Sequence, residues 1–277
     1  MIRPRMRWLA TGLLVTGLLA TSGASAQNAF MMDGGAFSNM MMQPQIYDGL
    51  RRNMELARGK DWGKEPPARR LSSGFANGDF DPQGMDRGRS NASGTSASRT
   101  GTSTGAITST IVKPVSASRI PAMLAQAYPE AARSQAERSF KQLLAGYHQI
   151  EQRFGVPRYD VAGAVAALLV GSWMAYHQSD FPDEHFAPLV QQMRGIISRN
   201  PDFAAADAQQ KQEMYEQLAI LGMLTATTQL ALKQNPDAPN AERAQANLSK
   251  AGKGYLEEFL KTDASRVQFT ARGLELR

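Results

Sequence analysis

Apolar residues recur every three or four positions through most of the chain beyond residue 118, which is the spacing of one face of an α-helix. Capping residues, glycines and prolines divide this pattern into five segments. The predicted helices span residues 129 or 130 to 154, 161–177, 184–199, 208–234 and 239–261. Asp160 and Asp207 are placed to cap the second and fourth helices, and Gly155 to end the first. The pattern therefore predicts an all-α fold, a single bundle of about five helices over residues 118–277.

Two of the predicted helices lack the polar face that the other three possess. Residues 161–177 contain no charged side chain, and neither do residues 217–232 of the fourth helix. A helix that is apolar on all sides lies in a core or in a membrane. The strongly apolar part of 161–177 is short for a bilayer span and rich in alanine. We expect both helices at the centre of the bundle, with membrane association through residues 161–177 as an alternative.

The two central helices also share a pattern of small residues. These are Gly163, Ala167 and Gly171 on the second helix, and Ala219, Gly222 and Ala226 on the fourth. Small side chains on one face allow two helix backbones to approach closely, and this does not require lipid. We therefore predict that these two helices cross at these faces.

The last residues show a different pattern. Val267 and Phe269 alternate with polar residues after Asp263. This alternation fits either a short extended segment or an irregular end, and the sequence does not decide between them.

The first 26 residues read as an export signal. Arg3, Arg5 and Arg7 precede an apolar stretch, and residues 24–26 are Ala-Ser-Ala, which fits the small-x-small cleavage rule. We expect cleavage after Ala26, no transmembrane span after that cleavage, and a periplasmic or secreted protein. The chain has no cysteine, so its domain must be held by its core without disulfides.

Residues 27–117 form a tail rich in Met, Gly, Ser and Thr. Such a composition buries too little apolar surface to offset the entropy of ordering, so we expect most of this tail to be disordered. Within it, Ile46, Leu50, Met54 and Ala57 recur at helical spacing and Gly59 follows as a stop. This spacing predicts a short helix over residues 46–58, which either forms transiently or folds on a partner.

Charge and composition exclude several classes of function. The net charge is +6, but residues 118–277 carry equal numbers of basic and acidic side chains. Binding to nucleic acid requires a concentrated positive surface, so we expect none. The absence of cysteine excludes thiolate catalysis, Cys-ligated zinc and iron–sulfur clusters. We identify no catalytic residues, because no nucleophile elbow, phosphate loop or dinucleotide motif is present.

One polar cluster carries candidate chemistry. His177, Asp180, Asp183 and His185 lie within nine residues, at the turn between the second and third predicted helices. Imidazole and carboxylate groups are ligands for a divalent metal such as Zn²⁺ or Mn²⁺. In the alternative interpretation, His177 stabilises a helix C-terminus and the acids are solvated or cap the next helix. Apart from such a divalent metal, the sequence predicts no cofactor.

Three segments resemble a bacterial family of exported all-helical domains of unknown function. They are residues 140–147 (Phe-Lys-Gln-Leu-Leu-Ala-Gly-Tyr), residues 173–176 (Trp-Met-Ala-Tyr) and residues 269–274 (Phe-Thr-Ala-Arg-Gly-Leu). The resemblance runs from Tyr128 to Glu275, about half the chain. It implies a bacterial source and one helical domain behind a variable tail, and it transfers no activity and no site residue.

Together these patterns favour a non-enzymatic interaction or structural module of the cell envelope. Its partner would be an envelope protein or a wall component of unknown identity. Two alternatives stay open: a metal-dependent activity or metal binding at the turn between His177 and His185, and membrane association through residues 161–177.

Overall fold

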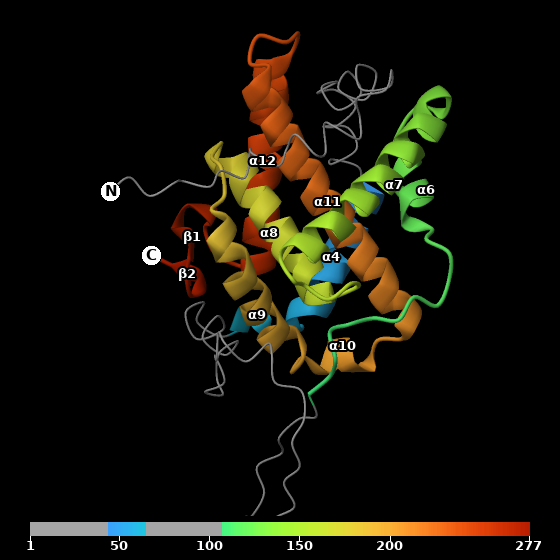
Figure 1. The fold of residues 1–277 in the computed structure, drawn as a ribbon, viewed down its shortest axis with the longest axis vertical. Coiled ribbons are helices and arrows are strands. Elements are labelled where there is room, and N and C mark those ends of the chain that lie inside the picture. The colour runs from blue at the N-terminus through green and yellow to red at the C-terminus, as the bar shows by residue number, and fades with distance from the viewer. Residues whose placement is uncertain (1–43, 65–106) are drawn as a thin grey trace, which may run out of the picture.

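The computed structural model describes residues 44–64 and 107–277 (Figure 1). The predicted signal peptide at residues 1–26 and the tail residues 27–43 and 65–106 lie outside the described residues, so the predictions made for them stay predictions.

Within the described residues the predicted all-α fold is confirmed. The helices are α4 (Pro44–Arg58), α6 (Ile120–Ala125), α7 (Glu130–Arg153), α8 (Val161–His177), α9 (Phe186–Ile197), α10 (Pro201–Ala205), α11 (Ala208–Gln234) and α12 (Ala241–Leu260). Single 3₁₀ turns occur at η2 (Trp62–Lys64), η5 (Asp183–His185) and η6 (Ala264–Arg266). A hairpin of β1 (Val267–Thr270) and β2 (Gly273–Leu276) ends the chain. The five long segments predicted from the pattern thus correspond to α7, α8, α9, α11 and α12.

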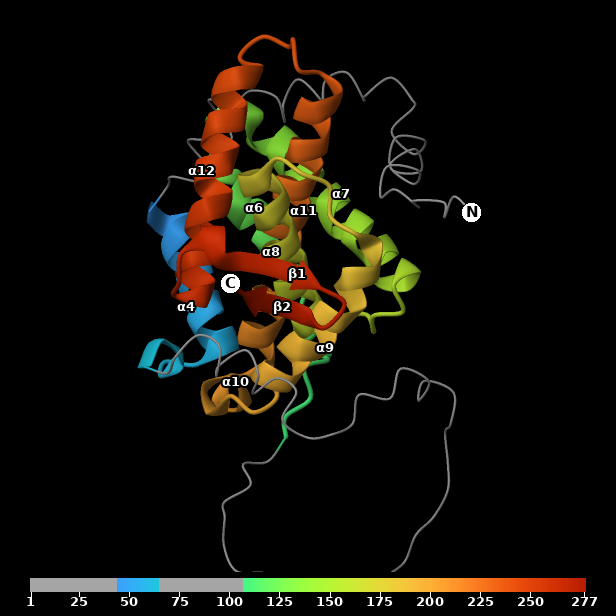
Figure 2. The ribbon, with the colours of Figure 1, turned by 90° about the vertical axis from the view of Figure 1, so that its left-hand side faces the viewer.

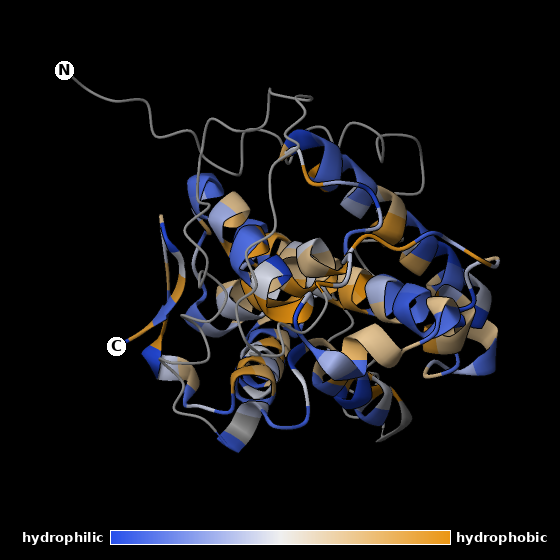
Figure 3. Cartoon of the chain, turned by 90° about the horizontal axis from the view of Figure 1, so that it is seen from below, coloured by the Kyte–Doolittle hydropathy of each residue, from blue (hydrophilic) through white to orange (hydrophobic). Residues whose placement is uncertain are grey.

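The charge-free helix α8 is the centre of the molecule. It packs against α11, α12 and α9, and almost all of its side chains are buried (Figure 1). The view in Figure 3 shows the hydrophobic residues gathered on the inner helices and the hydrophilic ones on the outer faces. Burying an uncharged helix on all sides removes its whole apolar surface from water, which is the dominant favourable contribution to folding.

No helix in the described part of the chain is both long and apolar enough to cross a bilayer.

The predicted crossing of α8 and α11 is present, and glycine permits it. A Cβ atom added to Gly222 of α11 would lie 2.6 Å from the backbone carbon of Ala167, and one added to Gly171 of α8 would lie 2.4 Å from the oxygen of Gly222. Gly163 differs from the prediction, since its missing Cβ faces the Tyr147 hydroxyl and Val156 instead of α11. A row of small residues four positions apart winds around the helix axis. Along the 17 residues of α8 its two ends therefore contact different neighbours.

The opposite side of α8 holds a close approach that the sequence analysis did not predict. A Cβ atom added to Gly252 of α12 would lie 2.4 Å from the backbone oxygen of Ser172. Helix α8 is therefore held between two glycine contacts, one from α11 and one from α12.

Local capping sets most helix boundaries as predicted. The Asp160 carboxylate accepts a hydrogen bond from the Ala162 amide at 3.0 Å, and Asp207 with Gln210 forms a capping box at the start of α11. The short helix α10 was not predicted. Asn200 caps α10 by accepting from the Asp202 amide at 2.9 Å.

The hairpin resolves the open question about the C-terminal residues. Val267 pairs with Leu276 and Phe269 with Leu274 in antiparallel register. Gln192 of α9 donates to the Leu274 carbonyl at 3.0 Å and accepts from the Leu274 amide at 2.8 Å. Figure 2 shows the hairpin lying across the ends of α9 and α12. This pairing depends on a side chain 82 residues away, so alternation alone could not establish it.

Two stretches that we expected in the tail contribute to the folded unit. Residues 107–117 run along the start of α8, where the Val112 amide donates to the Tyr159 carbonyl at 3.0 Å and the Val161 amide to that of Thr110 at 3.0 Å. Helix α4 begins two residues before the predicted helix and is packed on the bundle through its apolar face. The folded unit therefore extends beyond the predicted boundary at residue 118, because segments without a core of their own share the core of the bundle.

Candidate functional site

The turn predicted as a metal site is held by ion pairs to other helices. Lys233 of α11 donates to both carboxylate oxygens of Asp180 at 2.8 Å, and Arg153 of α7 donates to Asp183. Burial raises the pKa of Asp183, against the opposing effect of Arg153. Both carboxylates thus have cationic partners that compete with a metal ion for their oxygens.

The two histidines of this turn pack among aromatic rings. The ring centroids of His177 and Trp173 are 4.8 Å apart, and those of His185 and Phe181 are 6.3 Å apart. Burial lowers the pKa of His177. Among the residues that the structure describes, no group of three or more metal-ligating side chains converges on one point. The structure brings His177, Asp180, Asp183 and His185 to one end of α8, and metal binding there stays a prediction.

A second polar cluster lies inside the bundle around Glu151, whose side chain is 1% exposed. Its carboxylate accepts from the Tyr215 hydroxyl at 2.8 Å and from the Tyr159 amide at 3.1 Å, and it lies 2.9 Å from Nδ1 of His148. Burial raises the pKa of Tyr215 and of Tyr147, and Glu151 adds to both effects. These contacts join α7, α11 and the loop before α8, so the cluster fixes the relative positions of three elements.

The Glu151 cluster was not predicted from the sequence, although a signal was present. Glu151 follows Tyr147 by four positions and therefore lies on the same, inward face of α7. A carboxylate on a buried face needs donors, and tyrosine and histidine side chains on neighbouring helices are suitable ones.

The third candidate is the surface that receives α4, which we call the α4 seat. It consists of the faces of α9, α10, α11 and α12 that contact this helix. Ile46, Leu50, Met54 and Ala57 of α4 are at most 5% exposed, and Trp62 just beyond the helix packs on the ring of Phe259 at 6.3 Å. An amphipathic helix lying in an apolar groove is a recurrent mode of peptide recognition.

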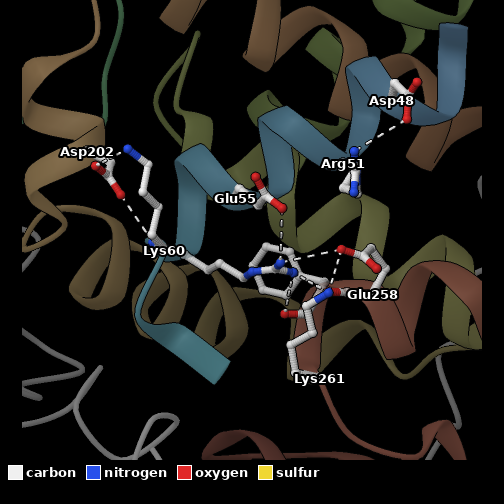
Figure 4. Close-up of polar contacts among 9 residues, drawn as sticks. Asp48, Arg51, Glu55, Lys60, Asp202, Glu258 and Lys261 are labelled. Atoms are coloured by element: carbon white, nitrogen blue, oxygen red, sulfur yellow. Dashed lines mark hydrogen bonds and ion pairs between the residues drawn. The ribbon is translucent and has the colours of Figure 1, made fainter. Parts of the chain in front are cut away.

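Directional polar contacts accompany this apolar row. The Arg58 guanidinium, 4% exposed, donates to the backbone oxygens of Glu258 and Phe259 and pairs with the Glu258 carboxylate at 3.4 Å. Lys261 also pairs with Glu258 at 2.6 Å (Figure 4). Burial lowers the pKa of Arg58 and Glu258 opposes this effect, so the guanidinium remains charged.

Two further contacts fix the position of α4 along the seat. Nδ2 of Asn53 donates to Oε1 of Gln217 on α11 at 2.5 Å. After Gly59, which has a positive φ of 89°, Lys60 lies 3.6 Å from Asp202 of α10 (Figure 4). Open depressions lined in part by Lys60 and Asp202 mark this rim of the seat.

The fold and the seat together define a helical bundle on which an amphipathic helix of the same chain is packed. Residues 83–277 match the model of a family of unknown function (DUF6683), and the chain belongs to this family. No curated protein and no solved structure matches the chain. Helix α4 precedes the matched residues, so the seat lies in the family domain and its occupant lies outside the matched region.

Proposed function

We propose that this protein is an exported, non-enzymatic interaction module of the bacterial cell envelope, with an envelope protein or a wall component as its partner. The observation that supports this proposal is the α4 seat. A domain whose surface already binds a helix by apolar and directional polar contacts has the features of a recognition module.

Export is proposed from the first 26 residues, and the rest of the chain is compatible with it. A basic start, an apolar stretch and Ala-Ser-Ala at residues 24–26 fit a cleaved signal. The bundle uses no disulfide, because the chain has no cysteine, and its stability rests on the packed core around α8.

The export part is tested by expressing the C-terminally tagged chain in a Gram-negative host and measuring the intact mass of the protein released by osmotic shock. We expect a chain beginning at Gln27 in the periplasm or the medium. An Ala24→Asp/Ala26→Asp variant, which removes the cleavage rule, is the matched control and should retain residues 1–26. Uncleaved protein confined to the cytoplasm would refute export.

The interaction part is tested by capture from solubilised envelopes with the tagged protein. An excess of the untagged chain serves as competitor. We expect at least one envelope protein or wall polymer whose recovery the competitor abolishes. Recovery of no component beyond that of a tag-only control would contradict the proposed role.

A further inference from the structure

We infer that the α4 seat binds an amphipathic helix of a partner protein, and that α4 is the intramolecular occupant that the partner displaces. This inference rests on the proposed function as an interaction module and adds the kind of partner and the way in which access is controlled.

Helix α4 is attached to the bundle differently from the other helices. In the sequence, 42 residues separate Lys64, which ends the described segment that contains α4, from Ile107, where the next described segment begins, so no tight turn joins α4 to the bundle. A helix of 15 residues is marginal in water by itself, so its helical state depends on docking. Ordering this segment costs conformational entropy of the same order as the gain from its buried apolar side chains. A segment of this kind opens more easily than the core.

The seat contains a buried polar group that α4 satisfies only in part. Gln217 of α11 is 1% exposed; its Oε1 accepts from Asn53, while its Nε2 has no hydrogen-bond partner among the residues that the structure describes. A buried donor without an acceptor weakens the complex in which it stays unpaired. A helix that donates to Oε1 as Asn53 does, and also presents an acceptor to Nε2, satisfies both ends of this amide and binds more tightly than α4.

Charge complementarity defines the other end of the partner helix. The Glu258 carboxylate, 16% exposed, and the backbone oxygens of Glu258 and Phe259 together form an acceptor group. Their arrangement suits the several donors of a planar guanidinium better than the single charge of an ammonium group. The partner helix therefore carries apolar residues at positions i, i+4 and i+8, and an arginine at i+12, as in Ile46, Leu50, Met54 and Arg58.

The connection to α4 also sets how strongly the seat is occluded. The tail that the sequence predicts to be disordered includes residues 65–106, a stretch of roughly 40 residues. A flexible tether of that length holds its end at about millimolar effective concentration, so a helix with a micromolar intrinsic affinity occupies the seat in cis. For an intrinsic dissociation constant of about 10 μM, this competition weakens the binding of a partner helix about 100-fold.

The test uses a fluorescent peptide of residues 44–64, titrated by anisotropy against the purified chain. The Leu50→Asp variant places a charge in the apolar row and releases α4 from the seat. We expect it to bind the peptide at least about tenfold more tightly than the unaltered chain. Arg51→Asp introduces the same residue at an exposed position of α4 and should behave as the unaltered chain. A peptide carrying Arg58→Lys should bind the Leu50→Asp variant about tenfold more weakly.

Two results would overturn the inference. In one, the Leu50→Asp chain keeps its helical circular dichroism and does not bind the peptide. In the other, the Leu50→Asp chain and the unaltered chain bind it equally well, since α4 then does not occlude the seat.

A second measurement does not depend on the fold of Leu50→Asp. Because the chain has no cysteine, Leu50→Cys and Leu248→Cys each provide a single thiol, both at buried positions. If α4 opens while the bundle stays folded, the thiol at position 50 reacts with a disulfide reagent at least about 100-fold faster than the one at position 248. Equal rates would mean that α4 leaves only when the bundle unfolds, and the inference would fail. Capture of an envelope partner could still succeed in that case, so the two proposals fail separately.

Discussion

Replacing Gly222 by alanine tests the close crossing of α8 and α11, on which the bundle is built. The added Cβ would lie 2.6 Å from the backbone carbon of Ala167 and 2.6 Å from the backbone nitrogen of Leu168. Both contacts are with backbone atoms of a buried helix, so no side chain can rotate away to make room. Ordinary contact begins at 3.4 Å, so the two helices must separate by about 0.8 Å at this point.

The magnitude follows from two opposing effects. Overpacking of this kind costs about 1–3 kcal/mol, because a gap of 0.5–1 Å along the rest of the interface also weakens its dispersion contacts. Alanine in place of glycine within a helix returns roughly 0.5–1 kcal/mol. We therefore expect Gly222→Ala to lower the free energy of unfolding by about 0–2.5 kcal/mol, which is about 1–3 kcal/mol below an alanine placed in a helix without overpacking.

Urea unfolding followed by circular dichroism at 222 nm measures this change, and an unchanged m-value shows that the variant unfolds as the unaltered chain does. Gly254→Ala in α12 is the matched control, since no atom of the described part of the chain lies within 4 Å of its added Cβ. It should gain about 0.5–1 kcal/mol. If Gly222→Ala is as stable as Gly254→Ala, the two helices do not approach as closely as described and the reasoning is refuted.

Two substitutions and a pH titration test the buried polar groups. Arg58→Ala removes a buried guanidinium and should lower the free energy of unfolding by about 1.5–3 kcal/mol in urea titrations; a change below 0.5 kcal/mol, on the scale of ordinary surface substitutions, would show that this ion pair is not formed. Tyr215→Phe removes a donor to the buried Glu151 and should cost about 1–3 kcal/mol by the same measurement, whereas no change would place that carboxylate in water. Burial raises the pKa of Tyr147, Tyr215 and Tyr255 above 10.0, the value of an unhindered phenol. The unfolded chain therefore loses these protons at a lower pH than the folded chain does. The free energy of unfolding should be unaffected below pH 10 and should fall above pH 10 by about 1.4 kcal/mol per pH unit for each tyrosine. Unfolding titrations between pH 8 and 11 that show a flat stability would contradict this.

The candidate sites show where sequence reasoning stops. The metal-ligand turn was predicted from four residues close in sequence, but the partners of its carboxylates, Lys233 and Arg153, come from α11 and α7. The pairing of Arg58 with Glu258 joins residues 200 positions apart. A single sequence does not indicate such partners, because any exposed charge is equally compatible with water.

The sequence by itself determined the local features of the fold and which helices are buried. Periodicity gave the long helices, caps such as Asp160 set their starts, and the absence of charge in α8 and in residues 217–232 of α11 placed both in the core. The local features depend on residues within a few positions of one another, and the burial of a helix depends on the transfer of its apolar surface from water. Neither effect depends on which other helix supplies the contacts.

Tertiary structure alone decided which faces meet. It turned Gly163 toward α7, placed Gly252 against α8, paired the hairpin with Gln192 and packed α4 on the faces of α9, α10, α11 and α12. The physical reason is that an apolar face or a buried polar group has many possible partners. Only the simultaneous packing of all the helices selects one of them.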